Sequence, residues 1–108
     1  MAGLKILGQA APSATTETDL YTVPSSTSTV ASSLIICNRG ASDASVRVSI
    51  SQGGGATVNK DYIYYSLIIP ANDTFIATIG ISLATTDKVR VYASTANVSF
   101  NLFGKENT

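Results

Sequence analysis

Residues 88–102 of the chain read KVRVYASTANVSFNL, and this stretch is the clearest sign of the fold class. On both sides of a short break at 94–97, apolar side chains alternate with polar ones. Alternation with a period of two is typical of strands that bury one face and expose the other. The stretch therefore predicts two strands. Because only residues 94–97 separate them, we expect the two strands to form a hairpin.

The composition extends this prediction to the whole chain of 108 residues. Val, Ile and Thr number 8, 10 and 13, whereas Leu, Met, Glu, Gln and Lys together number 16. Side chains branched at Cβ lose rotamer freedom in a helix and pack well on a pleated sheet. We therefore expect an all-β protein.

Turn-forming residues divide the chain into short segments. Clusters rich in Gly, Pro, Asn and Asp, at 38–40, 53–55 and 70–73, separate apolar stretches from one another. Eight short strands at regular spacing predict a single two-sheet β-sandwich, with either a jelly-roll or an immunoglobulin-like topology. The expected strands are 4–8, 18–23, 28–37, 45–52, 61–69, 73–81, 87–93 and 97–103.

A chain of this length is expected to form one domain. Residues 18–104 would form the sandwich. Residues 1–17 would form an N-terminal strand and an extended arm or linker, because 9–17 lack both bulky side chains and periodicity. Residues 105–108 would be a C-terminal tail. A free arm at either end, 1–17 or 104–108, could add a strand to the sheet edge of a neighbouring subunit.

Seven basic and seven acidic residues leave the chain without net charge. Nucleic-acid-binding proteins usually carry an excess of basic residues, so we expect no nucleic acid as a partner. No apolar run approaches the roughly 20 residues of a membrane span, and no signal peptide is recognisable. We therefore expect a soluble chain made in the cytosol. Its 14 Ser and 13 Thr favour a neutral surface that lies against other protein in an assembly.

The chain lacks the residues of the common catalytic and metal sites. It has no histidine, which removes Ser-His-Asp and Cys-His mechanisms and the commonest metal ligand. Cys37 is the only cysteine, so neither an internal disulfide nor a cysteine-based zinc cluster can form. The acidic residues are dispersed, mostly in predicted turns. We therefore expect no enzymatic activity, no cofactor and no metal site.

Three tyrosines fall within four positions of one predicted strand, 61–69. Tyrosine is enriched where one end of the side chain is buried and the other is wet. These rings either pack in the core or form a contact surface for protein or sugar. Three arginines leave a similar choice between a solvated strand face and a salt bridge to a neighbouring subunit. The six candidate interface residues are Tyr62, Tyr64, Tyr65, Arg39, Arg47 and Arg90.

Several segments resemble the small virion structural proteins of tailed bacteriophages. LYTVP at 20–24 leads into an apolar strand that ends in Cys37-Asn38. The similarity extends over residues 4–104. Its further segments are IPANDT at 69–74, GISL at 80–83, DKVRVYAS at 87–94 and VSF at 98–100.

The resemblance implies a non-enzymatic component of a virion, assembled in the host bacterial cytoplasm. The first expectation is a capsid decoration, or cement, protein that bridges neighbouring capsid subunits as a homotrimer. A tail, baseplate or fibre component is the alternative. The partners would be the major capsid protein or tail proteins, together with further copies of this chain. A host-surface carbohydrate-binding module, whose tyrosines stack on sugar rings, is another alternative, and only this one requires a glycan.

Overall fold

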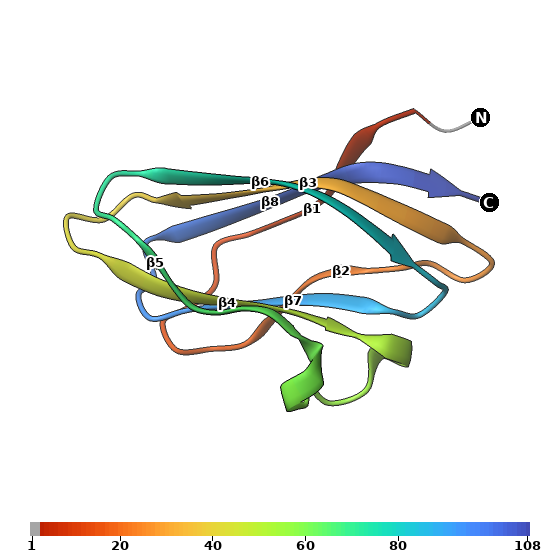
Figure 1. Cartoon of the computed structure of the whole chain (residues 1–108), viewed down its shortest axis with the longest axis horizontal. Helices are drawn as coiled ribbons and strands as arrows, with labels where there is room; N and C mark the ends of the chain where they lie inside the picture. The colour runs from red at the N-terminus through yellow and green to blue at the C-terminus, as the bar shows by residue number, and fades with distance from the viewer. Residues whose placement is uncertain (1–2) are drawn as a thin grey trace.

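The computed structural model describes residues 3–108 and shows an all-β protein (Figure 1). Its strands form two four-stranded antiparallel sheets that pack face to face, which confirms the predicted two-sheet sandwich. Met1 and Ala2, part of the predicted segment 1–17, lie outside the described residues. No helix within residues 3–108 has the length and apolarity needed to cross a membrane.

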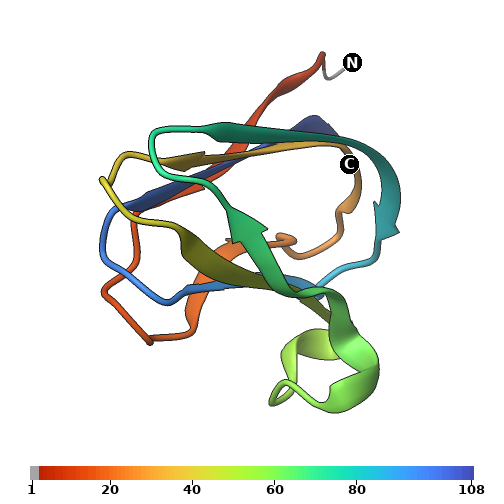
Figure 2. The ribbon, with the colours of Figure 1, turned by 60° about the vertical axis from the view of Figure 1, so that its left-hand side comes forward.

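The eight strands lie close to the predicted segments. Two short 3-10 helices, η1 (Gln52–Gly54) and η2 (Asn59–Asp61), connect the fourth strand to the fifth. This connection projects from the sandwich (Figure 2). The strands are β1 (Lys5–Ala10), β2 (Thr18–Thr22), β3 (Ser28–Asn38), β4 (Ala44–Ser51), β5 (Tyr62–Ile69), β6 (Thr74–Leu83), β7 (Lys88–Ala93) and β8 (Val98–Asn107).

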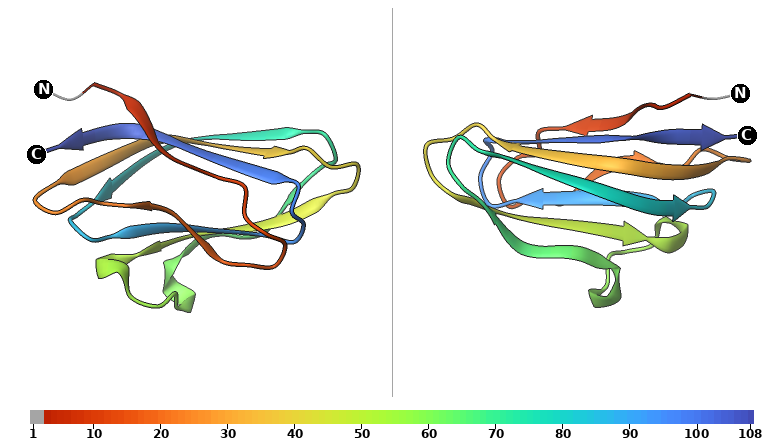
Figure 3. Two further views of the ribbon diagram at one scale, coloured as in Figure 1. Left: turned by 180° about the vertical axis from the view of Figure 1, so that it is seen from behind. Right: turned by 45° about the horizontal axis from the view of Figure 1, so that its top comes forward.

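The strand order identifies the sandwich as a jelly roll. One sheet has the order β1-β8-β3-β6 and the other β2-β7-β4-β5. β1 pairs with β8, β2 with β7, β3 with β6 and β4 with β5, so the chain is one long hairpin wound across two sheets. The start of β1 and the end of β8 therefore lie at the same end of the molecule (Figure 3). The immunoglobulin fold groups its strands differently.

The hairpin predicted at 94–97 is wrong, although both of its strands are present. β7 pairs with β2 and β4, whereas β8 pairs with β1 and β3 in the opposite sheet. Residues 94–97 therefore cross between the sheets. Val91 and Phe100, at 1% and 0% exposed, face the same core from opposite sides. Alternation reports which face of a strand is buried, but it does not report which strand lies beside it.

The inner faces of the two sheets form one hydrophobic core. The central strands of each sheet contribute most of its deeply buried side chains, because these strands have neighbours on both sides. Those side chains, each at most 1% exposed, include Leu34, Ile36, Val46, Val48, Val91, Ala93, Val98, Phe100 and Leu102.

A buried amide, Asn38, organises the end of the sandwich where β3 finishes. Its Nδ2 donates to the carbonyl oxygens of Ser42 and Ile69 at 2.9 and 3.0 Å, and to that of Pro70 at 3.3 Å. Its Oδ1 accepts from the backbone N–H of Gly40 at 2.9 Å. A buried polar side chain is tolerated only when such bonds satisfy it. Asn38 thereby ties the turn after β3 to the end of β5.

At the other end of β3, a hydrogen-bonded chain of side chains joins four strands. The Tyr21 hydroxyl on β2 lies 2.8 Å from Oγ1 of Thr29 on β3 and donates to the Glu106 carboxylate on β8. Lys5 on β1 forms an ion pair with the same carboxylate. Burial and the Glu106 hydrogen bond raise the pKa of Tyr21 to about 12. The hydrogen bonds from Lys5 and Tyr21 lower the pKa of Glu106.

The prediction that 105–108 form a tail is wrong for all of these residues except Thr108. β8 continues to Asn107, with Lys105 opposite Val30 and Glu106 opposite Thr29 on β3. The backbone pairs here even though the side chains are polar, which is why hydrophobicity alone ended the predicted strand too early. β1 also pairs within its own molecule, so the described part of the chain provides neither of the free arms expected from sequence.

We expect Tyr21→Phe to lower the free energy of unfolding at pH 7 by about 1–3 kcal/mol, because Thr29 and Glu106 each lose a buried partner. The pKa of Tyr21 is raised from 10 to about 12, so its contribution is complete below pH 10. Above pH 10 the Tyr21 hydroxyl ionises in the unfolded chain before it ionises in the folded protein. The wild type therefore loses this stability as the pH rises to about 12. The difference in the free energy of unfolding between wild type and Tyr21→Phe should narrow over that pH interval in urea titrations. Tyr64→Phe, which removes a hydroxyl outside this network, is the matched control, and a constant gap would contradict the assignment.

Candidate functional site

Two bulges in β5 decide which of its tyrosines reach the surface. β5 has one residue more than β4 between Tyr62 and Tyr64, and again between Tyr64 and Leu67. Ser66, at the second bulge, has a φ of +57°. Strict alternation would place Tyr62 and Tyr64 on one face. The bulges instead bring Tyr62 to the side of Tyr65 and turn Tyr64 towards the core.

A row of aromatic rings and one guanidinium crosses the outer face of this sheet. The rings of Tyr62 and Tyr65 meet edge to face, with centroids 4.9 Å apart. The Arg47 guanidinium on β4 lies 4.6 Å from the ring centroid of Tyr65 and 4.4 Å from that of Tyr92 on β7. Arg47 and Tyr92 are directly opposite each other in the β4–β7 ladder. We call the surface formed by Tyr62, Tyr65, Arg47 and Tyr92 the Tyr–Arg face.

The contacts within the Tyr–Arg face restrict its side chains. A cation close to an aromatic ring is attracted to the electron-rich face of that ring. Arg47 makes this contact with two rings, so much of its side-chain freedom is already lost in the isolated chain. Tyr65 nevertheless remains 60% exposed, and Ile68 on the same strand is 55% exposed. The surface is therefore internally packed and still accessible.

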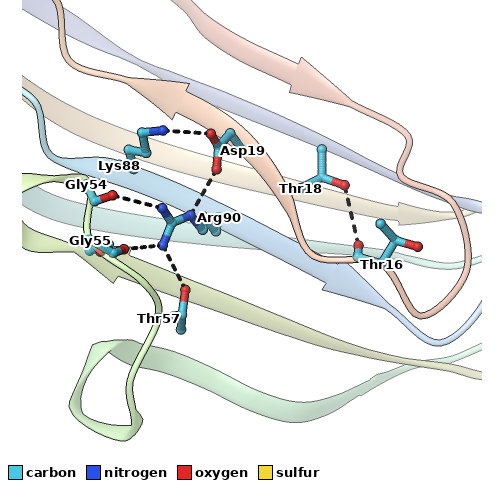
Figure 4. Close-up of polar contacts among 9 residues, drawn as sticks. Thr16, Thr18, Asp19, Gly54, Gly55, Thr57, Lys88 and Arg90 are labelled. Carbon is cyan, nitrogen blue, oxygen red and sulfur yellow. Dashed lines mark hydrogen bonds and ion pairs between the residues drawn. The ribbon is translucent and has the colours of Figure 1, made fainter.

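Arg90, beside this face on β7, is occupied by contacts within the chain (Figure 4). Its Nε donates to Oδ1 of Asp19 at 2.9 Å. Its Nη1 donates to the carbonyl oxygen of Gly55 at 2.6 Å and to the hydroxyl of Thr57 at 3.0 Å, and its Nη2 donates to the carbonyl oxygen of Gly54 at 3.1 Å. With a side chain only 12% exposed, Arg90 fastens the connection between β4 and β5 onto the sheet.

Asp19 on β2 completes this arrangement. Its carboxylate accepts hydrogen bonds from Lys88 and Arg90, both at 2.9 Å (Figure 4). These two hydrogen bonds lower the pKa of Asp19, so the carboxylate stays ionised at neutral pH and the ion pairs persist. Asp87 holds the same connection from another side, since it accepts from the backbone N–H groups of Gly53 and Ala84 at 2.8 Å. The glycine-rich segment is thus held at several points.

An open hollow lies at one edge of the Tyr–Arg face. Asn59, Tyr62 and Tyr65 line it, and its volume is about 270 Å³. Asn59 begins η2, so the connection that Arg90 fastens also forms one wall of the hollow. The hollow therefore combines two tyrosines with one asparagine.

Three of the six candidate residues come together, and these are Tyr62, Tyr65 and Arg47. Tyr64 packs inwards, with its ring edge to face against Phe75 of β6 at 5.6 Å. Its place on the core side makes the core interpretation correct for this tyrosine alone.

The two remaining arginines are placed elsewhere. Arg39 follows β3 and donates to Oγ of Ser99 and to the carbonyl oxygen of Ala96, at one end of the sandwich. Arg90 is adjacent to the Tyr–Arg face but is held by internal partners. Neither arginine offers a guanidinium comparable with that of Arg47.

Sequence reasoning missed Tyr92 and Asn59. Tyr92 belongs to the polar series of the alternating stretch 88–93, on the same side as Lys88 and Arg90, and this was a usable signal. The sequence gives no comparable signal for Asn59, because its position depends on how the connection between β4 and β5 folds back.

Within residues 3–108, no cluster of three or more His, Cys, Asp or Glu side chains has the geometry of a metal site. In comparisons with known proteins, no family model and no curated protein matches the chain. The geometry of the Tyr–Arg face is therefore the basis for the functional argument.

We expect Arg90→Lys to loosen the connection between β4 and β5. Lysine keeps a positive charge for Asp19, but it lacks the planar fork that reaches the Gly54, Gly55 and Thr57 oxygens together. The free energy of unfolding should fall by about 1–3 kcal/mol, and the amides of residues 53–58 should exchange faster with solvent in NMR experiments. Arg39→Lys is the control and should leave exchange at 53–58 unchanged. Equal exchange in wild type and Arg90→Lys would refute this role.

Proposed function

We propose that the chain is a non-enzymatic structural protein of a bacteriophage virion. Its role there is that of a capsid decoration, or cement, protein that bridges neighbouring capsid subunits. The observation that supports this proposal best is the Tyr–Arg face. Tyrosine and arginine are enriched in the buried centres of protein interfaces, where a few such residues provide most of the binding energy.

The order of the Tyr–Arg face favours binding to protein. Association costs free energy when flexible side chains become fixed, and less of this cost remains when they are already held. Arg47 contacts two rings and Tyr62 contacts Tyr65 in the free chain. A partner that covers Tyr65 and Ile68 would bury apolar area without having to order these side chains first.

The proposed mechanism is mechanical. The outer face of the opposite sheet also exposes apolar side chains, Ile6 at 53%, Val30 at 42% and Ile76 at 66%. A subunit with contact surfaces on both sides can touch two neighbours at once. Each added contact then has to break before the packaged DNA can push the capsid subunits apart.

Deleting the gene from its phage should give particles that assemble normally but release DNA at a lower temperature, as measured by dye access to DNA during heating. Added wild-type protein should restore the release temperature. A Tyr65→Ala/Arg47→Ala variant should not restore it, because the edge-to-face contact of Tyr65 with Tyr62 and both guanidinium–ring contacts of Arg47 are gone. Arg39→Ala, which lies outside this face, is the matched control. Mutant particles as heat-stable as wild type would sink the cement role, and failure to adsorb to cells would favour a tail, baseplate or fibre component instead.

One observation favours a second candidate, a host-surface carbohydrate-binding module. The hollow between Asn59, Tyr62 and Tyr65 is close in size to small ligand pockets, and it offers aromatic rings and an amide to a sugar. On a glycan array, this candidate predicts binding that Tyr65→Ala lowers at least about tenfold and that Tyr64→Phe leaves intact, because Tyr64 points inwards. No binding to any glycan by the wild type would exclude it.

A further inference from the structure

The outer edge of β6 is unpaired, and the first half of the strand lacks the usual protection of an edge strand. β6 is the last strand of its sheet, as the right-hand view of Figure 3 shows. Its ten residues, TFIATIGISL, include neither a charged residue nor a proline. Natural edge strands normally carry charges, prolines or bulges that prevent pairing with another chain.

The other three edge strands of the described chain have such protection. β1 contains Lys5 and a bulge, and β2 contains Asp19 and a bulge. β5 is interrupted by two bulges. β6 also has one bulge relative to β3, between Thr78 and Ile81, so only residues 74–78 form a regular, open and uncharged strand edge.

We infer that residues 74–78 pair antiparallel with the same residues of a second copy of this chain. The pairing places Ile76, which is 66% exposed, on a two-fold axis opposite Ile76 of the second copy. The two four-stranded sheets would then join into one sheet of eight strands. This inference does not rest on the proposed function.

The side chains of this segment complement themselves in that register. On the outer face, Thr74 lies opposite Thr78 of the second copy, and threonine pairs across strands can hydrogen-bond. On the inner side, Phe75 lies opposite Ala77, which sets a large side chain against a small one. Phe75 is only half-buried in the isolated chain, at the rim of the core beside Tyr64. A second copy would cover this rim.

The same register keeps like charges apart. The nearest charge in the sequence is Asp73, directly before β6. With Ile76 on the axis, the two Asp73 residues lie six positions apart along the joined strands, roughly 20 Å, which exceeds the screening length of about 8 Å at physiological salt. On β3, the residues paired with 74, 76 and 78 are Cys37, Ile35 and Ser33, all uncharged. Neither residues 74–78 nor their β3 partners therefore place like charges against each other.

A five-residue strand pair makes a small interface, so the dimer should be reversible and depend on concentration. In light scattering after size exclusion, the purified full chain should approach twice its 11.2 kDa mass as the concentration rises. Ile76→Lys should weaken association at least about tenfold, because two lysines would lie directly opposite each other. Ile68→Lys is the matched control, since Ile68 is a similarly exposed isoleucine, at 55%, on the edge strand β5 of the other sheet.

Cysteine cross-linking tests the register itself. In a Cys37→Ser background, Ile76→Cys should form a disulfide-linked dimer under mild oxidation, because paired residues on a two-fold axis are close enough for that bond. Thr78→Cys should not cross-link to itself, since its two copies would be four positions, roughly 13 Å, apart. Retained circular dichroism and cooperative unfolding would show that each variant is folded.

Three results would overturn the inference. They are a monomer at every concentration, a trimer like the one expected from the phage resemblance, and a dimer that Ile68→Lys disrupts while Ile76→Lys does not. A monomer that still protects particles against heat would overturn this inference and leave the proposed function standing. A β6 dimer that has no effect on particle stability would do the reverse.

Discussion

The pairing of β3 with β8 is the interaction on which the rest of the structure depends. It is the central pair of its sheet and joins Ser28–Asn38 to Val98–Asn107 over almost their whole length. It sets Leu34 beside Leu102 and Ile36 beside Phe100, so the most deeply buried side chains of this sheet come from residues 68 and 64 positions apart in sequence. β1 can then add beside β8, and β6 beside β3. The order β1-β8-β3-β6 of this sheet is built around this one long-range contact.

The same order determines how the two outer faces differ. In the β2-β7-β4-β5 sheet, β4 and β7 set Arg47 opposite Tyr92, and the bulges of β5 bring Tyr65 to the other side of the guanidinium. Arg90, which is paired with Asp19, binds the connection between β4 and β5. This connection forms one wall of the neighbouring hollow. The other sheet has no comparable cluster in its described residues, and its unprotected feature is the β6 edge. One small domain therefore offers two chemically distinct surfaces.

Much of the fold could be predicted from local pattern. Alternation identified β7 and β8 and their buried faces, and turn residues set most strand limits within a few positions. The pattern failed wherever the outcome depended on a distant partner. Residues 94–97 cross between sheets because β7 and β8 each have other neighbours. β8 extends to Asn107 because β3 supplies a paired backbone, not because Lys105 or Glu106 is apolar. Of the candidate interface residues, Tyr64 points inwards because of the two bulges in β5, and no glycine or proline in that strand indicated a bulge.

The sequence by itself determined an all-β sandwich and the residue types available for contact. Branched side chains and a period of two favour strands through local stereochemistry, which acts within each segment. The absence of histidine follows directly from the composition. Only the tertiary structure decided the jelly-roll order, the assembly of Tyr62, Tyr65, Arg47 and Tyr92 into one face, and the exposure of the β6 edge. Each of these depends on which strands become neighbours. Strand pairing is made by backbone groups that all residues except proline share, so it leaves little trace in the order of side chains.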